Sequence, residues 1–79
     1  MARRFTVIKY ARMLLGLTQE ELARAIGRSR SLVSLVENRR YALSPELQAE
    51  VVSFFERYWA DATIDKLFDR ETGLAKEMR

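Results

Sequence analysis

The stretch TQEELARAIGRSRSLVSLVEN, residues 18–38, decides the fold. Its apolar residues recur at helical spacing in two groups on either side of Gly27, which predicts two short helices. The inward-facing positions are Leu22, Ala23 and Ile26 in the first helix and Val33 and Val36 in the second. Gly27 stands where the first helix must stop, because glycine adopts the left-handed conformation of a helix end without strain. Small Ala23 allows the second helix to cross the first closely and at a steep angle.

This stretch resembles the helix-turn-helix of the phage repressor and Cro family, and the resemblance extends over roughly residues 7–55. The matching positions are Thr18-Gln19-Glu20-Glu21-Leu22-Ala23, Gly27, Ser29, Val33-Ser34 and Glu37-Asn38. The resemblance implies an all-α, lambda-repressor-like DNA-binding domain of five helices. Its second and third helices would form the helix-turn-helix, with the third presented to the major groove of DNA.

The composition argues against several classes of protein. The 79 residues contain no Cys and no His, so a disulfide framework, a thiolate or imidazole metal site and a histidine general base are all excluded. No base is evident to activate a serine, so we expect no enzyme, no cofactor and no small-molecule ligand. Lys9 and Arg12 interrupt the segment that follows the basic start, so we expect no signal peptide, no membrane span and a cytoplasmic protein.

Charge is divided unevenly along the chain. Residues 1–40 hold nine Arg or Lys against three Glu, a balance of +6, whereas residues 41–79 hold five basic and eight acidic residues, a balance of −3. A basic half that carries the helix pair fits a side that faces DNA, and an acidic half fits a side that faces away from it. The alternative interpretation is an ordinary solvated surface.

We expect one domain, because no repeat, linker or low-complexity segment divides the chain. The expected parts are a basic arm at 1–5, a four-helix core at 6–58, a fifth helix at 61–72 and a loose charged tail at 74–79. The arm either contacts DNA or is frayed. Thr6 is the predicted N-cap of the first helix, and Ser44 followed by Pro45 opens the fourth. Gly73 is the predicted end of the fifth helix.

Arg12 lies on or beside the inward stripe of the first helix, where a charge is unfavourable unless it is paired. The resemblance provides a partner, because an Arg at this place commonly pairs with a Glu at the end of the third helix. Arg12 and Glu37 match these two positions. Such a pair would tie the two helices together. Removing one of the two side chains should then lower the stability of the fold more than replacing both.

The resemblance also implies contacts to DNA. Base contacts are expected on the outward face of the third helix, from Arg30, Ser31, Ser34 and Leu35. The guanidinium fork of Arg30 matches O6 and N7 of guanine, and the alternative for Arg30 is a phosphate contact. The resemblance implies contacts to the DNA backbone from Gln19 and Asn38. We also expect such contacts from the polar and basic residues around the helix ends, Thr18, Arg28, Ser29, Arg39 and Arg40. In the family, the Gln at position 19 also braces the third helix.

Two residues depart from the family pattern. Leu35 stands where a polar residue is common; it would either pack on thymine methyl groups or contact a protein partner. Arg39 stands where many members have the glycine that ends the third helix. The turn there must differ, or Arg39 must take an unfavourable left-handed conformation.

The helix that begins at Pro45 carries two apolar stripes. The first closes the core. The second stripe and the helix that follows it share six large apolar residues, Val52, Phe55, Trp59, Ile64, Leu67 and Phe68. Either the last helix folds back over this stripe, or the six residues form a two-fold dimer interface. We favour the dimer, because proteins that place a helix in the groove usually pair on two half-sites.

The sequence therefore predicts a sequence-specific transcription regulator that binds double-stranded DNA. Its simplest form is a repressor that acts as a homodimer on a near-palindromic operator. The competing hypothesis is a protein-interaction module, such as an antirepressor or a small scaffold, with the same fold. Leu35 and the apolar stripe favour that alternative, whereas Arg30, Arg39 and Arg40 argue against it.

Overall fold

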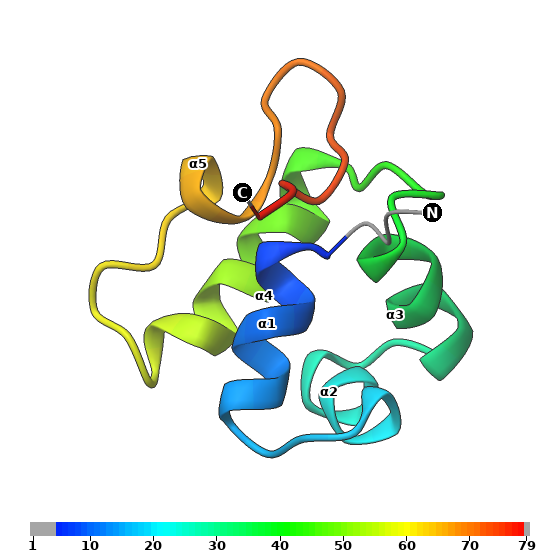
Figure 1. The fold of residues 1–79 in the computed structure, drawn as a ribbon, viewed down its shortest axis with the longest axis vertical. Helices are drawn as coiled ribbons and strands as arrows, with labels where there is room; N and C mark the ends of the chain where they lie inside the picture. The colour runs from blue at the N-terminus through cyan, green and yellow to red at the C-terminus, as the bar shows by residue number, and fades with distance from the viewer. Residues whose placement is uncertain (1–4, 79) are drawn as a thin grey trace.

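The computed structural model describes residues 5–78, so Arg3 and Arg4 of the expected arm lie outside the described residues (Figure 1). The helices in chain order are α1 Val7–Leu14, α2 Gln19–Ile26, α3 Arg30–Glu37, α4 Pro45–Glu56 and α5 Ile64–Leu67. Between residues 5 and 78 the only β pairing consists of two isolated bridges. The predicted all-α architecture is confirmed. No helix in this range has the length and hydropathy that crossing a bilayer requires.

Side-chain caps define the turn between α2 and α3. The Thr18 hydroxyl accepts from the Glu21 amide at 3.1 Å, and the Glu21 carboxylate accepts from the Thr18 amide at 2.8 Å, which completes a capping box. Gly27 ends α2 with a φ of +71°. The Ser29 hydroxyl then accepts from the Leu32 amide at 3.1 Å and starts α3. These local signals explain why α2 ends and α3 begins here.

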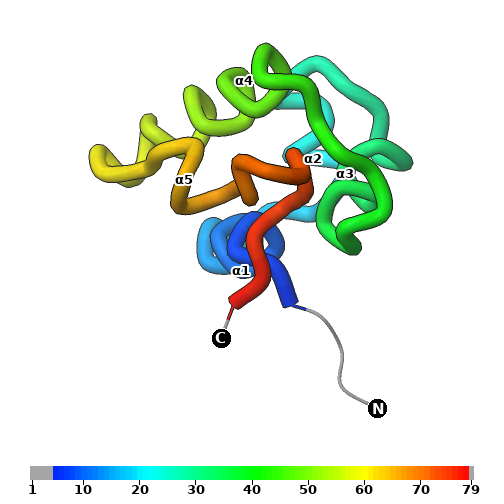
Figure 2. The backbone as a smooth tube through the Cα atoms, turned by 90° about the horizontal axis from the view of Figure 1, so that it is seen from above, coloured from blue at the N-terminus to red at the C-terminus, as the bar shows by residue number. Residues whose placement is uncertain are grey.

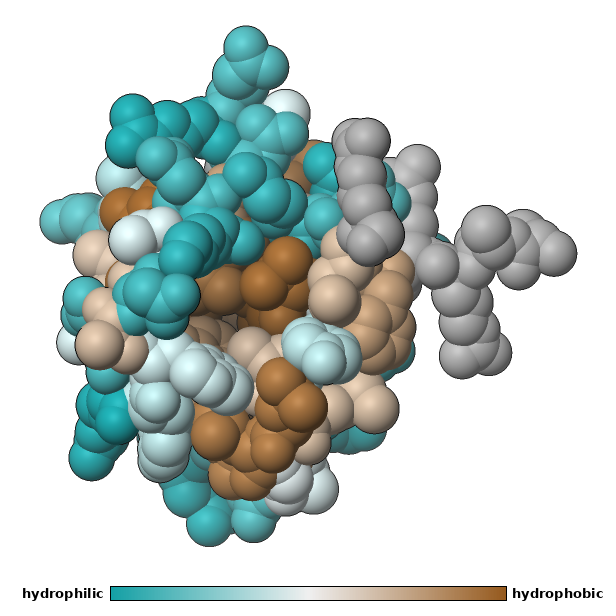
Figure 3. All heavy atoms as spheres, turned by 60° about the vertical axis from the view of Figure 1, so that its left-hand side comes forward, coloured by the Kyte–Doolittle hydropathy of each residue, from teal (hydrophilic) through white to brown (hydrophobic). Residues whose placement is uncertain are grey.

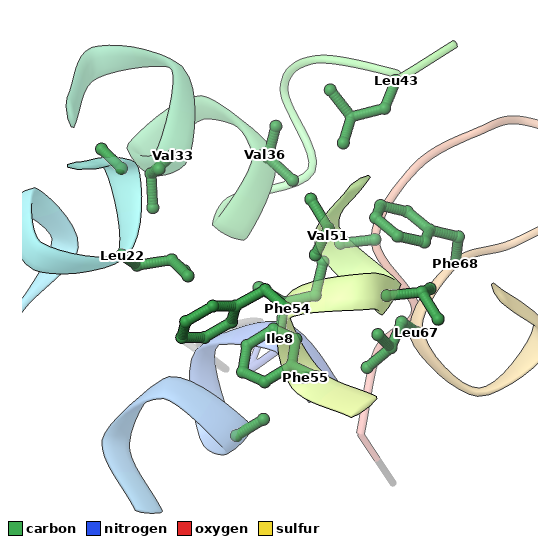
Figure 4. Close-up of a cluster of buried hydrophobic side chains, with 14 residues drawn as sticks. Ile8, Leu22, Val33, Val36, Leu43, Val51, Phe54, Phe55, Leu67 and Phe68 are labelled. Carbon is green, nitrogen blue, oxygen red and sulfur yellow. The ribbon is translucent and has the colours of Figure 1, made fainter. Parts of the chain in front are cut away.

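The core lies where α2 and α3 meet α4 above α1 (Figure 4). Leu22 of α2 and Val33 of α3 point towards Phe54 of α4, and all three side chains are buried. Phe55 is fully buried and packs in the same cluster as Ile8 of α1. Burying one such large side chain contributes roughly 1.5–3 kcal/mol, so this cluster fixes how the helix pair sits on α4.

Helix α5 is shorter than the helix expected over residues 61–72. Thr63 caps it, with its hydroxyl accepting an amide of the first turn at 3.3 Å. The helix spans only Ile64–Leu67, and Phe68 is already extended, with φ −130° and ψ 151°. The chain leaves the helix here because the Phe68 ring is fully buried and its backbone forms a bridge with Ala75.

Residues 68–78, here called the C-terminal segment, pack onto the domain, so residues 74–78 are not the loose tail that the sequence suggested. The Val7 amide donates to the Lys76 carbonyl at 2.9 Å, and Ala75 is fully buried. Figures 1 and 2 both show this segment beside the start of α1. The first and last described residues are therefore neighbours in space.

Most of the second apolar stripe of α4 is buried within the domain. Of the six predicted interface residues, Val52, Phe55, Leu67 and Phe68 are buried, and Trp59 and Ile64 are half-buried against the same core. The six residues therefore do not form one exposed interface as predicted, because the fold buries four of them. This is the alternative arrangement that the sequence left open.

Candidate nucleic-acid interface

Glu37, the last residue of α3, carries a fully buried carboxylate. Arg12 of α1 donates to both of its oxygens, from Nε to Oε2 at 2.6 Å and from Nη2 to Oε1 at 3.1 Å. The remaining Arg12 nitrogen, Nη1, donates to the Leu17 carbonyl at 2.7 Å. The structure thus brings together the two residues of the expected pair. Because the two parallel bonds restrict how the guanidinium and the carboxylate can be oriented, this pair ties α1 to the end of α3.

Two further side chains hold the end of α3. Gln19 of α2 donates from Nε2 to Glu37 Oε1 at 3.1 Å, and the Thr6 hydroxyl donates to the Glu37 carbonyl at 3.1 Å. Gln19 is half-buried, and its bond to Glu37 braces the end of α3 against α2. The sequence predicts Thr6 only as the N-cap of α1. Its bond to Glu37, 31 positions away, could not be predicted because no neighbouring residue indicates it.

The outer face of α3 is predominantly polar and accessible. Its exposed residues are Arg30, Ser31 and Leu35, and Ser34 is half-buried. Within residues 5–78 the Arg30 guanidinium has no hydrogen-bond or ion-pair partner. The first turn of α3 contains no acidic residue, so its positive dipole end is not neutralised locally. This face can therefore accept an anionic or acceptor-rich ligand.

The turn after α3 is the left-handed one of the two forms expected at Arg39. Arg39 has a φ of +57°, and the Arg40 amide donates to the Leu35 carbonyl at 2.8 Å. The Asn38 side-chain amide donates to the Ser34 carbonyl at 2.8 Å. Together these bonds cap the exposed carbonyls of α3. Asn38 and Arg40 remain exposed beside the outer face.

Arg39 does not face outward as expected for a residue that contacts the DNA backbone. Its side chain is 16% exposed, its Nε donates to the Ala75 carbonyl at 2.9 Å, and its Nη1 lies 3.4 Å from the Glu77 carboxylate. The left-handed backbone turns the side chain towards the C-terminal segment. Sequence reasoning missed this role because Ala75 and Glu77 were assigned to a loose tail.

The other residues expected to contact the DNA backbone fall into two groups. The Arg28 Nη2 lies 3.1 and 3.3 Å from the two carboxylate oxygens of Glu50 on α4, but both side chains are partly exposed, so this bridge is weak. Thr18 and Ser29 are exposed, and their hydroxyls serve as caps. Each of these two hydroxyl groups accepts one backbone amide, so it can still donate its proton, and accept through its other lone pair, to a ligand.

A hydrophobic hollow of about 240 Å³ lies on another face of the molecule (Figure 3). Tyr10 and Leu14 of α1 line it together with Trp59, which follows α4. No residue of α2 or α3 contributes to it. The hollow is therefore separate from the outer face of α3.

Over residues 5–78 no group of three or more His, Cys, Asp or Glu side chains lies close enough together to hold a metal ion.

Comparison with known proteins agrees with this geometry. A family model described as Helix-turn-helix matches residues 8–55, which run from α1 almost to the end of α4. No curated protein and no solved structure matches the chain. The matched range contains both members of the Arg12–Glu37 pair and the whole of α3.

Proposed function

The chain belongs to the helix-turn-helix family and is a DNA-binding transcription regulator, and from this premise we propose that it is a sequence-specific repressor that binds a near-palindromic operator as a homodimer. The observation that carries the proposal is the accessible outer face of α3. The buried Glu37 carboxylate and its partners Arg12 and Gln19 hold this face at one orientation. A fixed orientation is what insertion of a helix into the major groove requires.

In this proposal the outer face of α3 contacts base edges. Arg30 donates two hydrogen bonds to O6 and N7 of guanine, a contact worth about 1–3 kcal/mol of discrimination. Ser31 and Ser34 are short, which lets the helix approach the bases closely, and their hydroxyls bond to base edges. The exposure of Arg30, and its lack of a partner within residues 5–78, support this assignment.

The DNA backbone is contacted around the ends of α2 and α3. Thr18 and Ser29 lie at the starts of these helices, and Asn38 and Arg40 follow the end of α3. Arg40 adds a charge that neutralises one phosphate, worth roughly 0.9 in the slope of log K against log salt. Arg28 joins these contacts if its exposed bridge to Glu50 opens.

The dimensions of the molecule support binding to two half-sites. Half-sites of a two-fold operator lie about 34–36 Å apart, one turn of the duplex. The molecule measures 32 × 23 × 21 Å, so one copy fits on each half-site without overlapping the other. Occupying a promoter in this way blocks transcription without any further activity, which is why we propose repression.

Selection from a random duplex library tests the proposal. We expect a two-fold symmetric motif with half-sites one turn apart, and sedimentation of the complex with two chains on each duplex. A motif without symmetry and one chain on each duplex would contradict the homodimer. The absence of any motif, with a folded protein, would contradict sequence-specific binding altogether.

A transcription assay tests the direction of regulation. The selected motif is placed across a promoter on a linear template, and transcript is measured as protein is added. We expect transcript to fall as the motif is occupied, and a template with a scrambled motif to be unaffected. A rise in transcript would identify an activator and contradict repression.

A further inference from the structure

One apolar side chain interrupts the polar outer face of α3. Leu35 is 41% exposed, whereas the core-facing Val33 and Val36 of the same helix are 3% and 5% exposed. Ser31 one turn earlier and Asn38 almost one turn later lie on the same face and are exposed. Leu35 is thus not a part of the hydrophobic core. Its side chain lies in the middle of the surface to which the proposed function assigns base contacts.

The residues around Leu35 leave it prominent. Ser31 and Ser34 have shorter side chains, and the Asn38 amide is folded back onto the Ser34 carbonyl at 2.8 Å. The Leu35 carbonyl is already engaged by the Arg40 amide at 2.8 Å, so the backbone here offers little to a ligand. What Leu35 presents to the groove is therefore a branched hydrocarbon.

The chemistry of base edges limits what such a group can recognise. Leu35 has no donor or acceptor, so pressing it against N7, O6 or an exocyclic amine would bury a polar group without a partner, which is unfavourable. The apolar group that a base displays in the major groove is the C5-methyl of thymine. 5-Methylcytosine carries the same group. Contact between two apolar surfaces removes both from water, which is favourable.

Resting on the proposed function, we propose that Leu35 recognises the 5-methyl group of one pyrimidine in each half-site. The operator then contains thymine, or methylated cytosine, opposite Leu35. Recognition depends on a methyl group rather than on a hydrogen bond. A single chemical substitution in the DNA therefore tests it without changing base pairing.

The experiment uses the duplex selected by the wild-type protein. Each thymine is replaced in turn by deoxyuridine, which removes only the methyl group, and binding is measured at constant salt for the wild type and for Leu35→Ala. We expect deoxyuridine at one position in each half-site to weaken wild-type binding about three- to fivefold, the value of burying one methyl group. Leu35→Ala is expected to bind both duplexes equally.

Two variants serve as controls. Leu35→Met keeps an apolar side chain of similar reach, and we expect it to retain the preference for thymine. Met13→Ala shortens an apolar side chain that is 53% exposed on α1, away from the outer face of α3, and we expect it to behave as the wild type does. A second pair of duplexes places cytosine or 5-methylcytosine at the sensitive position. We expect the wild type, but not Leu35→Ala, to bind the methylated duplex more tightly than the cytosine duplex. Comparing this gain with the gain that thymine gives over deoxyuridine shows which source of the methyl group is preferred.

The outcomes separate this inference from the proposed function. If the wild type selects a motif but no deoxyuridine substitution has an effect that depends on Leu35, methyl recognition is overturned and sequence-specific binding stands. If folded wild-type protein selects no motif, the proposed function fails first. In that case a protein partner becomes the better explanation for an exposed Leu35, and the inference is overturned with it.

Discussion

The Arg39 Nε donates to the Ala75 carbonyl at 2.9 Å and so joins the end of α3 to the C-terminal segment. Arg39 has a φ of +57°, a conformation that costs a residue with a side chain roughly 1–2 kcal/mol. Contacts with Ala75 and with Glu77 offset this cost. These contacts explain how Arg is accommodated at a helix end where glycine would be less strained. The position of α3 thus depends partly on residues at the far end of the chain.

Two substitutions at position 39 separate strain from contact. Arg39→Ala loses the contacts to the C-terminal segment and keeps the left-handed strain, whereas Arg39→Gly loses the same contacts and relieves the strain. We expect Arg39→Ala to be less stable than Arg39→Gly by about 1 kcal/mol, measured by urea denaturation. Equal stability of the two variants would contradict the strained conformation.

The salt dependence of DNA binding distinguishes Arg39 from Arg40. Arg40 is exposed and is expected to contact a phosphate, so Arg40→Ala lowers the slope of log K against log salt by roughly 0.9. Arg39 is held by the C-terminal segment, so Arg39→Gly leaves the slope close to that of the wild type. If both variants lowered the slope equally, Arg39 would have to leave Ala75 and reach the DNA.

The buried ion pair between Arg12 and Glu37 predicts a non-additive effect on stability. Arg12→Met leaves the Glu37 carboxylate buried without its main partner and is expected to cost about 3–5 kcal/mol in urea denaturation. Adding Glu37→Leu removes that charge, and we expect the double variant to recover most of the loss. A double variant no more stable than Arg12→Met would show that the two residues do not act as a unit.

Gly73 and Gly16 form a matched pair for testing how closely the C-terminal segment packs. Their φ values are +75° and +72°, so substitution by Ala introduces the same backbone strain at both. A Cβ at position 73 would lie 2.9 Å from the Leu43 carbonyl oxygen, whereas position 16 has no atom within 4 Å. We expect Gly16→Ala to lose about 1 kcal/mol and Gly73→Ala about 2 kcal/mol or more, by thermal or urea unfolding. Equal losses would mean that the segment does not press on Leu43.

The parts of the fold that the sequence predicts correctly depend on neighbouring residues. The Thr18 capping box, the Ser29 cap and the left-handed Gly27 are each formed by residues within four positions of one another. The alternation of Val33 and Val36 with exposed residues also follows from the helical period alone. Local signals therefore suffice for the helix pair and for its outward face.

The parts that the sequence does not predict depend on distant contacts. Ile64, Leu67 and Phe68 have helical spacing, yet Phe68 is extended because its ring is buried and its backbone pairs with Ala75. The direction of Arg39 is set by a carbonyl 36 residues away. Of the six apolar residues that the sequence groups as an interface, four are buried by the chain itself. Apolar spacing indicates that a face is buried, but it does not indicate what buries it.

The claim that α3 contacts bases through Arg30 is tested most directly by repeating the library selection with Arg30→Ala. Arg24→Ala is the matched control, because Arg24 is an exposed Arg on α2 whose nearest charge is Glu20 at 3.6 Å. We predict that Arg30→Ala selects a motif relaxed at one symmetric pair of positions, with guanine no longer preferred there, while Arg24→Ala selects the wild-type motif. A motif unchanged in Arg30→Ala, with affinity reduced equally for all duplexes, would contradict base contact by Arg30 and place it on the phosphate backbone.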